Sequence, residues 1–179
     1  MNKLIKKFVG SICLVLSLVG LSPMGWADAS AELVEALAAQ GITLTPEQEG
    51  LIDQDTSIDE LAAIILGDST DASFVVSLTR ALVALYPNDL PSIAGAIAMG
   101  APAAAGVATG VLVEAAVASG SSNSVISIVS AAVTVAPSQA LSIADAAVEA
   151  APQLQDQIIA TIESVSGNTL EQESDAPSL

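Results

Sequence analysis

The feature that most constrains the fold of this chain is a 15-residue recurrence of proline among alanine and β-branched residues. Ala-Pro steps occur at 136–137 and again at 151–152. The same spacing continues upstream, so that six units can be aligned, and these begin at Ala72, Pro87, Pro102, Ser122, Pro137 and Pro152. Their phase is interrupted once, by five residues, at the Ser/Gly-rich stretch 118–122. A fixed internal period of this kind is typical of repeat architectures.

Within each unit the apolar residues recur at a helical spacing. When the first residue of a unit is counted as zero, apolar side chains fall mainly at offsets 3, 6, 7, 10 and 11, on one face of an α-helix. Proline at the start of a unit clashes with a helix that would continue through it, and its fixed φ suits the first turn of the next helix. Each unit is therefore predicted to hold one short helix and a tight corner.

These units predict an all-α fold, a short-helix repeat array with one helix per 15-residue unit. The array is expected to be α-solenoid-like or to form a compact multi-helical bundle. Short corners should make successive helices antiparallel neighbours. The repeat region is expected to span residues 72–166, and the polar, acidic residues 167–179 are expected to form a disordered tail.

The opposite face of each unit, at offsets 5 and 8, is mostly polar and is predicted to face solvent. The unit that begins at Pro102 departs from this pattern, since Val107 and Gly110 occupy these offsets and Val111 lies beside them. A helix that is apolar on all sides is either central in a fold or part of an interface. Gly106 and Gly110 also form a GxxxG pattern, which permits close helix packing. We therefore predict self-association, or binding of a protein partner, through Val107, Gly110 and Val111.

Residues 28–71 form an acidic N-terminal segment in which three helices are predicted. Residues 30–40 have a helical pattern, with Gly41 as a stop signal. Thr45 and Ser57 are each followed three residues later by Gln or Glu, which is the sequence of a capping box at the start of a helix.

The first 27 residues are predicted to be a secretory signal peptide. Three lysines precede a short apolar core at 8–21, and small residues near Ala27 suit cleavage after that residue. The apolar core is short for a membrane span. We therefore expect an exported protein that is periplasmic or extracellular.

Removal of this leader would leave few kinds of reactive side chain. Arg80 would be the one basic residue against 20 acidic ones, a formal side-chain charge of −19, and no Cys, His, Lys or Trp would remain. Zinc sites made of Cys and His, and catalysis by Cys, His or Lys, are then excluded. Nucleic-acid binding is not expected, because phosphate groups are bound by Lys and Arg.

The acidic stretch 53–59 resembles the opening of an EF-hand calcium loop. Ile58 stands where that loop needs glycine for its sharp turn, and Ile64 stands where it needs a bidentate glutamate. The sequence therefore predicts no metal site. It also predicts no cofactor and no catalytic residue, and the chain is not expected to be an enzyme.

Residues 90–144 contain a single charged side chain, that of Glu114. A membrane-active or envelope-inserted protein that uses this region is the alternative interpretation. Prolines within the region, the serine-rich outer face and the absence of flanking basic residues and aromatic belts favour a buried core or an association surface instead.

The Ala-Pro units at 72–165 resemble alanine-rich helical repeats in uncharacterised proteins exported by Gram-negative bacteria. The resemblance implies export and a helical-repeat fold, and it implies no activity and no functional residue. The predicted function is that of a secreted, non-enzymatic helical-repeat protein. Such a protein would act by self-assembly or by protein binding, in the periplasm or outside the cell.

Overall fold

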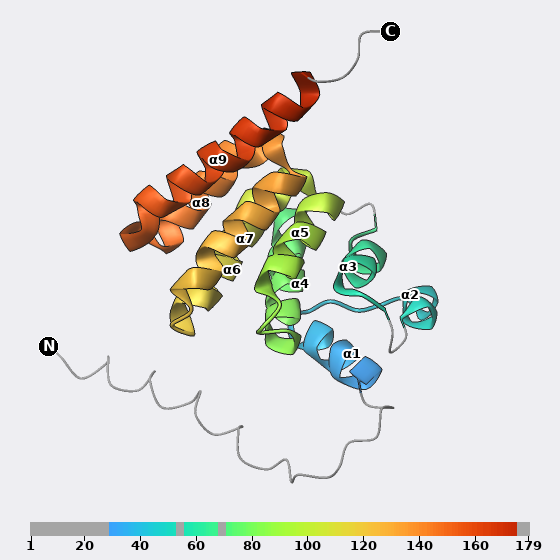
Figure 1. The fold of residues 1–179 in the computed structure, drawn as a ribbon. Helices are drawn as coiled ribbons and strands as arrows, with labels where there is room; N and C mark the ends of the chain where they lie inside the picture. Colours follow the sequence, from blue (N-terminus) through green and yellow to red (C-terminus); the bar gives the residue numbers. More distant parts are fainter. Residues whose placement is uncertain (1–28, 53–55, 68–70, 175–179) are drawn as a thin grey trace, which may run out of the picture.

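A computed structural model describes residues 29–52, 56–67 and 71–174 of the chain (Figure 1). Within these residues the fold is entirely helical, which confirms the all-α prediction. The α-helices are α1 (Ala29–Ala39), α2 (Pro46–Leu51), α3 (Ile58–Leu66), α4 (Ala72–Leu85), α5 (Leu90–Gly100), α6 (Ala105–Ala118), α7 (Ser122–Val135), α8 (Ala140–Ala150) and α9 (Gln155–Ser174). The short 3₁₀ helices η1 (Pro102–Ala104), η2 (Pro137–Gln139) and η3 (Pro152–Leu154) lead into α6, α8 and α9. The predicted signal peptide, 1–27, lies outside the described residues.

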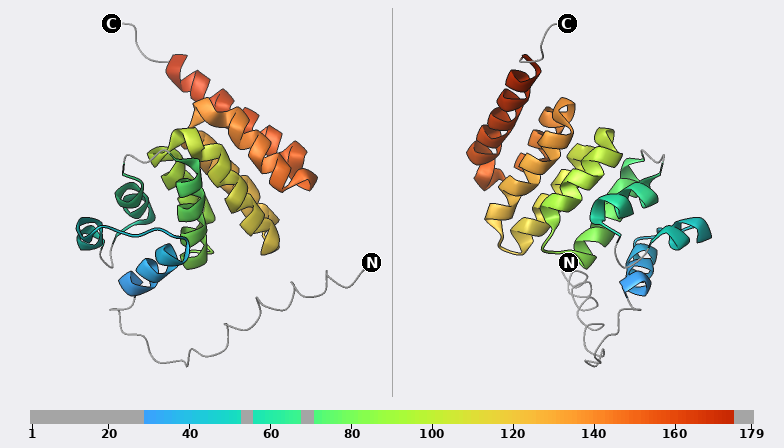
Figure 2. Two further views of the ribbon diagram at one scale, coloured as in Figure 1. Left: turned by 180° about the vertical axis from the view of Figure 1, so that it is seen from behind. Right: turned by 45° about the vertical axis from the view of Figure 1, so that its right-hand side comes forward.

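The helices from α3 onward form two rows, in which each helix packs mainly on the next but one in sequence. One row holds α3, α5, α7 and α9, and the other holds α4, α6 and α8 (Figures 1 and 2). Helix α1 packs on α4 at the N-terminal end of the second row. The chain turns by 118° between Ser122–Val135 and Pro137–Ala150. Successive helices are therefore not the main neighbours that the sequence predicts, because each short corner carries the chain from one row to the other.

The corners between the rows repeat one backbone arrangement at Ala101, Ala136 and Ala151. Each alanine donates its N–H to the carbonyl four residues earlier, at 2.8–2.9 Å, and accepts the N–H three residues later, at 2.9 Å. Their ψ angles, between 65° and 68°, end the helix, and the proline that follows has no N–H to satisfy. All three alanine side chains are buried, so that a larger one would displace its neighbours. Tyr86, before Pro87, makes the same pair of backbone hydrogen bonds with a ψ of 60°, so proline is the residue that all four corners share, and alanine is the small residue that fits the three buried ones.

The interruption of the 15-residue period extends α6 before its corner. Val117 stands where proline would end the helix, and α6 continues to Ala118. Gly120 then adopts a φ of 74°, and Ser121 donates its N–H to the carbonyl of Ala116 at 2.8 Å. A positive φ is easily adopted by glycine, which makes Gly120 the helix stop in place of an Ala-Pro step.

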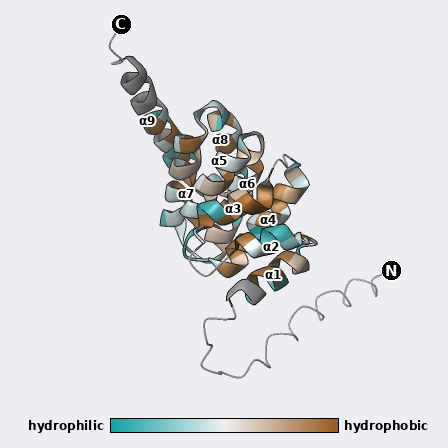
Figure 3. Cartoon of the chain, turned by 90° about the vertical axis from the view of Figure 1, so that its right-hand side faces the viewer, coloured by the Kyte–Doolittle hydropathy of each residue, from teal (hydrophilic) through white to brown (hydrophobic). Residues whose placement is uncertain are grey.

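The helices at the N-terminal end begin with side-chain caps. Thr45 and Ser57 form the predicted capping boxes with Gln48 and Glu60, at the starts of α2 and α3. Asp71 caps α4 by accepting the N–H groups of the residues at 73 and 74, at 2.8 and 3.0 Å. Figure 3 shows hydrophilic residues gathered around α2, whereas hydrophobic and weakly polar residues cover much of the central helices. Helices α1, α2 and α3 are the three helices that the sequence predicts before residue 72.

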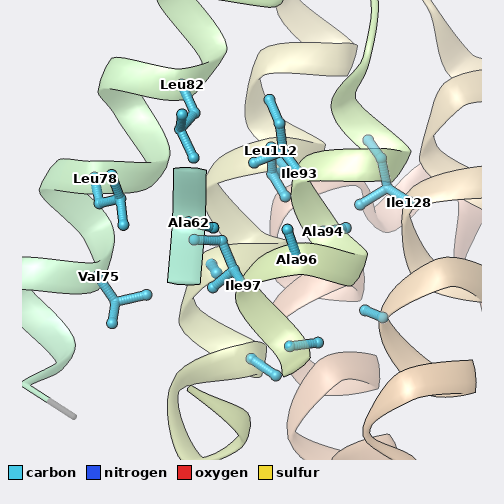
Figure 4. Close-up of a cluster of buried hydrophobic side chains, with 14 of the residues drawn as sticks. Ala62, Val75, Leu78, Leu82, Ile93, Ala94, Ala96, Ile97, Leu112 and Ile128 are labelled. Carbon is cyan, nitrogen blue, oxygen red and sulfur yellow. The ribbon is translucent and has the colours of Figure 1, made fainter. Parts of the chain in front are cut away.

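A continuous apolar core fills the space between the two rows. The residue at offset 6 is buried in every unit, and these residues are Leu78, Ile93, Ala108, Ile128, Ile143 and Ile158. Figure 4 shows Leu78, Ile93 and Ile128 within this core, together with Leu112 of α6. Full burial of one such large side chain contributes about 1.5–3 kcal/mol to folding.

The predicted disordered tail at 167–179 differs from the structure, in which α9 continues to Ser174. No proline occurs between Pro152 and Pro177 to end the helix. Gly167 alone lowers helix stability by about 1 kcal/mol, which does not stop a helix that is already formed. Residues 175–179 lie outside the described part of the chain.

Candidate interaction surfaces

The acidic side chains that the structure describes do not converge on a reaction centre. No group of three or more His, Cys, Asp or Glu that could hold a metal occurs among the described residues, and part of the EF-hand-like stretch, 53–55, lies outside them. Every Asp and Glu whose side chain is described is exposed. The hydroxyl of Ser73, and then the N–H groups of Phe74 and Ser73, lower the pKa of Asp71 below its ordinary 3.8. These bonds belong to the cap of α4, so the shifted pKa reflects a structural role.

The GxxxG pattern packs α6 directly against α8. A Cβ placed on Gly106 would lie 2.1 Å from the Oγ of Ser142 and 2.8 Å from its carbonyl oxygen. One turn later, a Cβ placed on Gly110 would lie 3.5 Å from the Cβ of Ala146. The two contacts advance together by four residues, so α6 and α8 run parallel. The close-packing role expected of these glycines is thus met within the chain.

The three residues predicted to bind a partner occupy different environments. Gly110 is half-buried against α8 and does not face solvent as its offset predicts, because the next helix of the row approaches α6 from that side. Val111 is half-buried, and Val107 is 45 % exposed. Val107 therefore remains the accessible apolar side chain of this set.

A hollow of about 480 Å³ lies between α1 and α2. Its lining is mainly apolar and consists of Leu33, Val34, Glu35, Ala38, Leu44, Glu49 and Ile52. Both glutamates are exposed, so the hollow holds no desolvated acid that could act as a general acid or base. Its chemistry is that of a shallow apolar depression with an acidic rim.

The C-terminal end of the two rows exposes positions that are covered elsewhere. In the units that begin at 87, 102 and 122, every residue at offsets 4, 7, 8 and 11 is buried or half-buried, because the next helix of the same row covers it. In the last two units, which hold α8 and α9, six of these eight positions are exposed. We name this set the terminal face, and its residues are Leu141, Ala144, Asp145, Val148, Asp156, Ile159, Ala160 and Glu163.

Two large apolar side chains stand out on the terminal face. Leu141 is 82 % exposed, although it has the same offset as the buried Gly106 of α6. Ile159 is 41 % exposed, although it has the same offset as the buried Val129 of α7. Helices α8 and α9 are the last of their rows and lie at the outer edge of the molecule (Figures 1 and 2). The C-terminal end of the two rows therefore exposes two large apolar side chains, together with acidic residues, at positions that are covered in the central helices.

In the part of the chain that the structure describes, no single helix has both the length and the apolar composition to cross a membrane. Ser122–Val135 and Pro137–Ala150 meet these criteria only as a bent pair.

Comparison of the chain with protein-family models, with curated proteins and with solved structures finds no match.

The terminal face is not evident from the residues of a single unit. Offset 4 is neither inward nor outward on the helix, so it separates no polar from apolar residues within a single unit. The residue type at offset 4 differs between the central and the last units. Gly106 and Ile126 occupy this offset in α6 and α7, whereas Leu141 and Asp156 occupy it in α8 and α9. That change is informative only when it is known that offset 4 faces the next helix of the row.

Proposed function

We propose that this chain is an exported, non-enzymatic helical-repeat protein that binds a protein partner through the terminal face. Its helices form an α-solenoid-like array of single-helix units, two of which make one structural repeat. The observation that carries the proposal is the exposure of Leu141 at a position that the array covers in α6. Repeat proteins normally end in a unit with a polar outer face, and the exposed Leu141 departs from that pattern.

The chemistry of the chain supports a binding role over a catalytic one. The part expected after export has no Cys, His or Lys, and its described acids are exposed and spread over the surface. General acid–base catalysis needs a carboxyl group positioned beside a bound substrate, and carboxylates spread over an open surface lack that arrangement. The exposed apolar and acidic side chains are suited to binding another molecule, which favours a binding role over a catalytic one.

The same absence of cysteine gives a direct experiment. The exported chain would be free of thiols, so Leu141→Cys introduces a unique site for a photoactivatable crosslinker. We expect crosslinking in the exporting cells to yield a defined adduct from position 141 and none from Met99→Cys, at an exposed methionine outside the terminal face. Equal adducts from both positions, or none from either, would contradict protein binding at the terminal face.

Membrane activity of the charge-poor region 90–144 is the second candidate, and the bent pair α7–α8 is the observation that favours it. Against it, Val125, Ile128 and Val129 of α7 are fully buried in the core and are not free to meet lipid. Flotation with vesicles of neutral and anionic lipid tests this candidate. Floating of the folded protein with the vesicles would support it over protein binding.

A further inference from the structure

We infer that the occupant of the terminal face is an amphipathic helix of a partner protein that carries Lys or Arg beside its apolar face. This inference rests on the proposed function, since it names the chemistry of the partner for the same face. Three observations support it. Helix α8 covers the equivalent positions of α6, large apolar side chains are exposed on the terminal face, and exposed acids lie on the same face.

The rest of the array indicates that a helix fits this face. Offsets 4 and 8 of α6 are Gly106 and Gly110, and they are covered by the parallel helix α8. The same offsets of α8 are Leu141 and Asp145, and no helix of the described chain lies over them. A helix in the next place of this row would continue the packing already seen. An amphipathic helix laid in an apolar groove is a common mode of recognition.

The shape of the face differs from the covered one in a way that selects the partner. Gly106 allows α8 to approach closely, whereas Leu141 projects from the surface of α8. Ile159 and the half-buried Val148 are the other large apolar side chains of the terminal face. A projecting side chain of one helix packs into the groove between side chains of a second helix. We therefore expect large apolar side chains on the partner, spaced at three and four residues, on both sides of Leu141.

The charges of the face indicate a basic partner. Asp145, Asp156 and Glu163 belong to the terminal face, are exposed, and have no basic residue among them. At the covered offsets of α5, α6 and α7 there is no charged residue at all. Lys and Arg are therefore expected where the partner helix meets these three acids, because complementary charge favours encounter and correct orientation.

The same charges disfavour a second copy of this chain as the occupant. The other end of the array is also acidic, with Glu35 and Glu49 at the rim of the hollow between α1 and α2. Arg80 is the one basic side chain among the described residues, and it lies on α4. End-to-end contact of two copies would therefore bring like charges together.

The test uses two matched synthetic peptides of about 14 residues, roughly four helical turns. Both carry leucines at a helical spacing; one has lysines at the other positions and its control has glutamates. Fluorescence anisotropy measures their binding to the chain from residue 28 onward. We expect the lysine peptide to bind and the glutamate peptide not to bind. Leu141→Ser and Ile159→Ser should each weaken binding about tenfold or more, as expected for loss of a buried apolar contact.

Control variants separate docking from general attraction of a cationic peptide. Met99→Ser removes an apolar side chain of α5 that is 64 % exposed and lies outside the terminal face, and it should leave binding unchanged. Equal loss in Met99→Ser and Leu141→Ser, or equal binding of both peptides, would overturn the inference. Light scattering that shows a dimer of the wild type but not of Leu141→Ser would assign the face to a second copy and also overturn it. The same holds if the lysine peptide binds only after removal of residues 175–179, since the tail would then be the occupant.

The two proposals can fail separately. A partner protein crosslinked from position 141 without binding of the lysine peptide would retain the proposed function and refute the basic helix. Absence of both would refute both.

Discussion

The central helices α5, α6 and α7 and the terminal helices α8 and α9 are built from the same 15-residue unit but are completed differently. Each central helix is covered by other helices on its inner face and on both sides within its row. The terminal helices keep the inner contact, as the full burial of Ile143 and Ile158 shows, and lack the next helix of the row. The comparison teaches that the pattern within one unit fixes the inner face, whereas the sides of a helix depend on its place in the array.

The N-terminal and later helices also differ in how they begin. Side chains cap α2, α3 and α4, whereas α6, α8 and α9 follow a 3₁₀ turn at an Ala-Pro corner. A side-chain cap serves one helix, while the corner ends one helix and begins the next with a single arrangement of backbone hydrogen bonds. The regular part of the array therefore needs no capping residue, and its corners can be made of Ala and Pro alone.

The largest expected effect is loss of a core side chain from the centre of the array. Ile128→Ala in α7 should lower the free energy of unfolding by about 4 kcal/mol, because it leaves a cavity that the surrounding helices cannot fill. The matched substitution in the last helix, Ile158→Ala, should cost less, about 2 kcal/mol, because a helix with one open side can relax toward the cavity. Urea unfolding monitored by circular dichroism measures both. Equal costs would indicate that the end of the array is packed as rigidly as its centre.

The close contact between α6 and α8 gives the next largest effect. Gly106→Val should destabilise the protein by about 3 kcal/mol, because its Cβ would overlap Ser142, including the carbonyl oxygen of the backbone. Gly110→Ala is the control, since its Cβ would meet Ala146 at 3.5 Å, an ordinary contact. Alanine also favours a helix over glycine by about 1 kcal/mol, so Gly110→Ala should be neutral or stabilising. Thermal unfolding that ranks the two variants in the opposite order would contradict the arrangement of this row.

A smaller, pH-dependent effect on stability is expected from the side-chain cap of α4. The pKa of Asp71 is lower in the folded protein than its ordinary 3.8, so its contribution to stability is present above that pH and is lost as the pH falls through the folded-state pKa. Asp71→Ala should therefore lower the melting temperature at neutral pH, and its difference from the wild type should shrink below pH 3.8 and disappear once the pH lies below the folded-state pKa of Asp71. Thr45→Ala removes a cap that does not titrate, and its difference from the wild type should persist. A difference for Asp71→Ala that is independent of pH would show that the carboxylate charge is not what caps α4.

The smallest effect on stability is expected on the terminal face. Leu141→Ser removes a side chain that is 82 % exposed, so the free energy of unfolding should change by no more than about 0.5 kcal/mol. This sharpens the comparison with Ile128→Ala, which removes a residue of similar size. A large loss of stability in Leu141→Ser would mean that the face is covered within the folded chain, and its role would then be structural.

Much of the architecture could be predicted from the residues of single units. The offsets predict the buried face, and the structure buries offset 6 in all six units, from Leu78 to Ile158. In the last unit the prediction is wrong at offsets 3, 7 and 11, because Gln155, Ile159 and Glu163 are exposed. Thr45 and Ser57 predict capping boxes, and both are formed. The end of the last helix could not be predicted as well, because polar residues after Gly167 resemble a tail yet extend α9 to Ser174.

The features that follow from the residues of single units are therefore local: an all-α chain, the helix starts, the Ala-Pro corners and the buried position at offset 6. These follow from proline geometry, capping hydrogen bonds and a period of 3.6 residues, all of which act within about one turn of helix. Only the tertiary structure decided that alternate helices pack together, that Gly110 faces α8, and that Leu141 is left uncovered. The physical reason is that the sides of a helix are buried by residues some 36 positions away, such as Gly106 against Ser142, and no local pattern contains that contact.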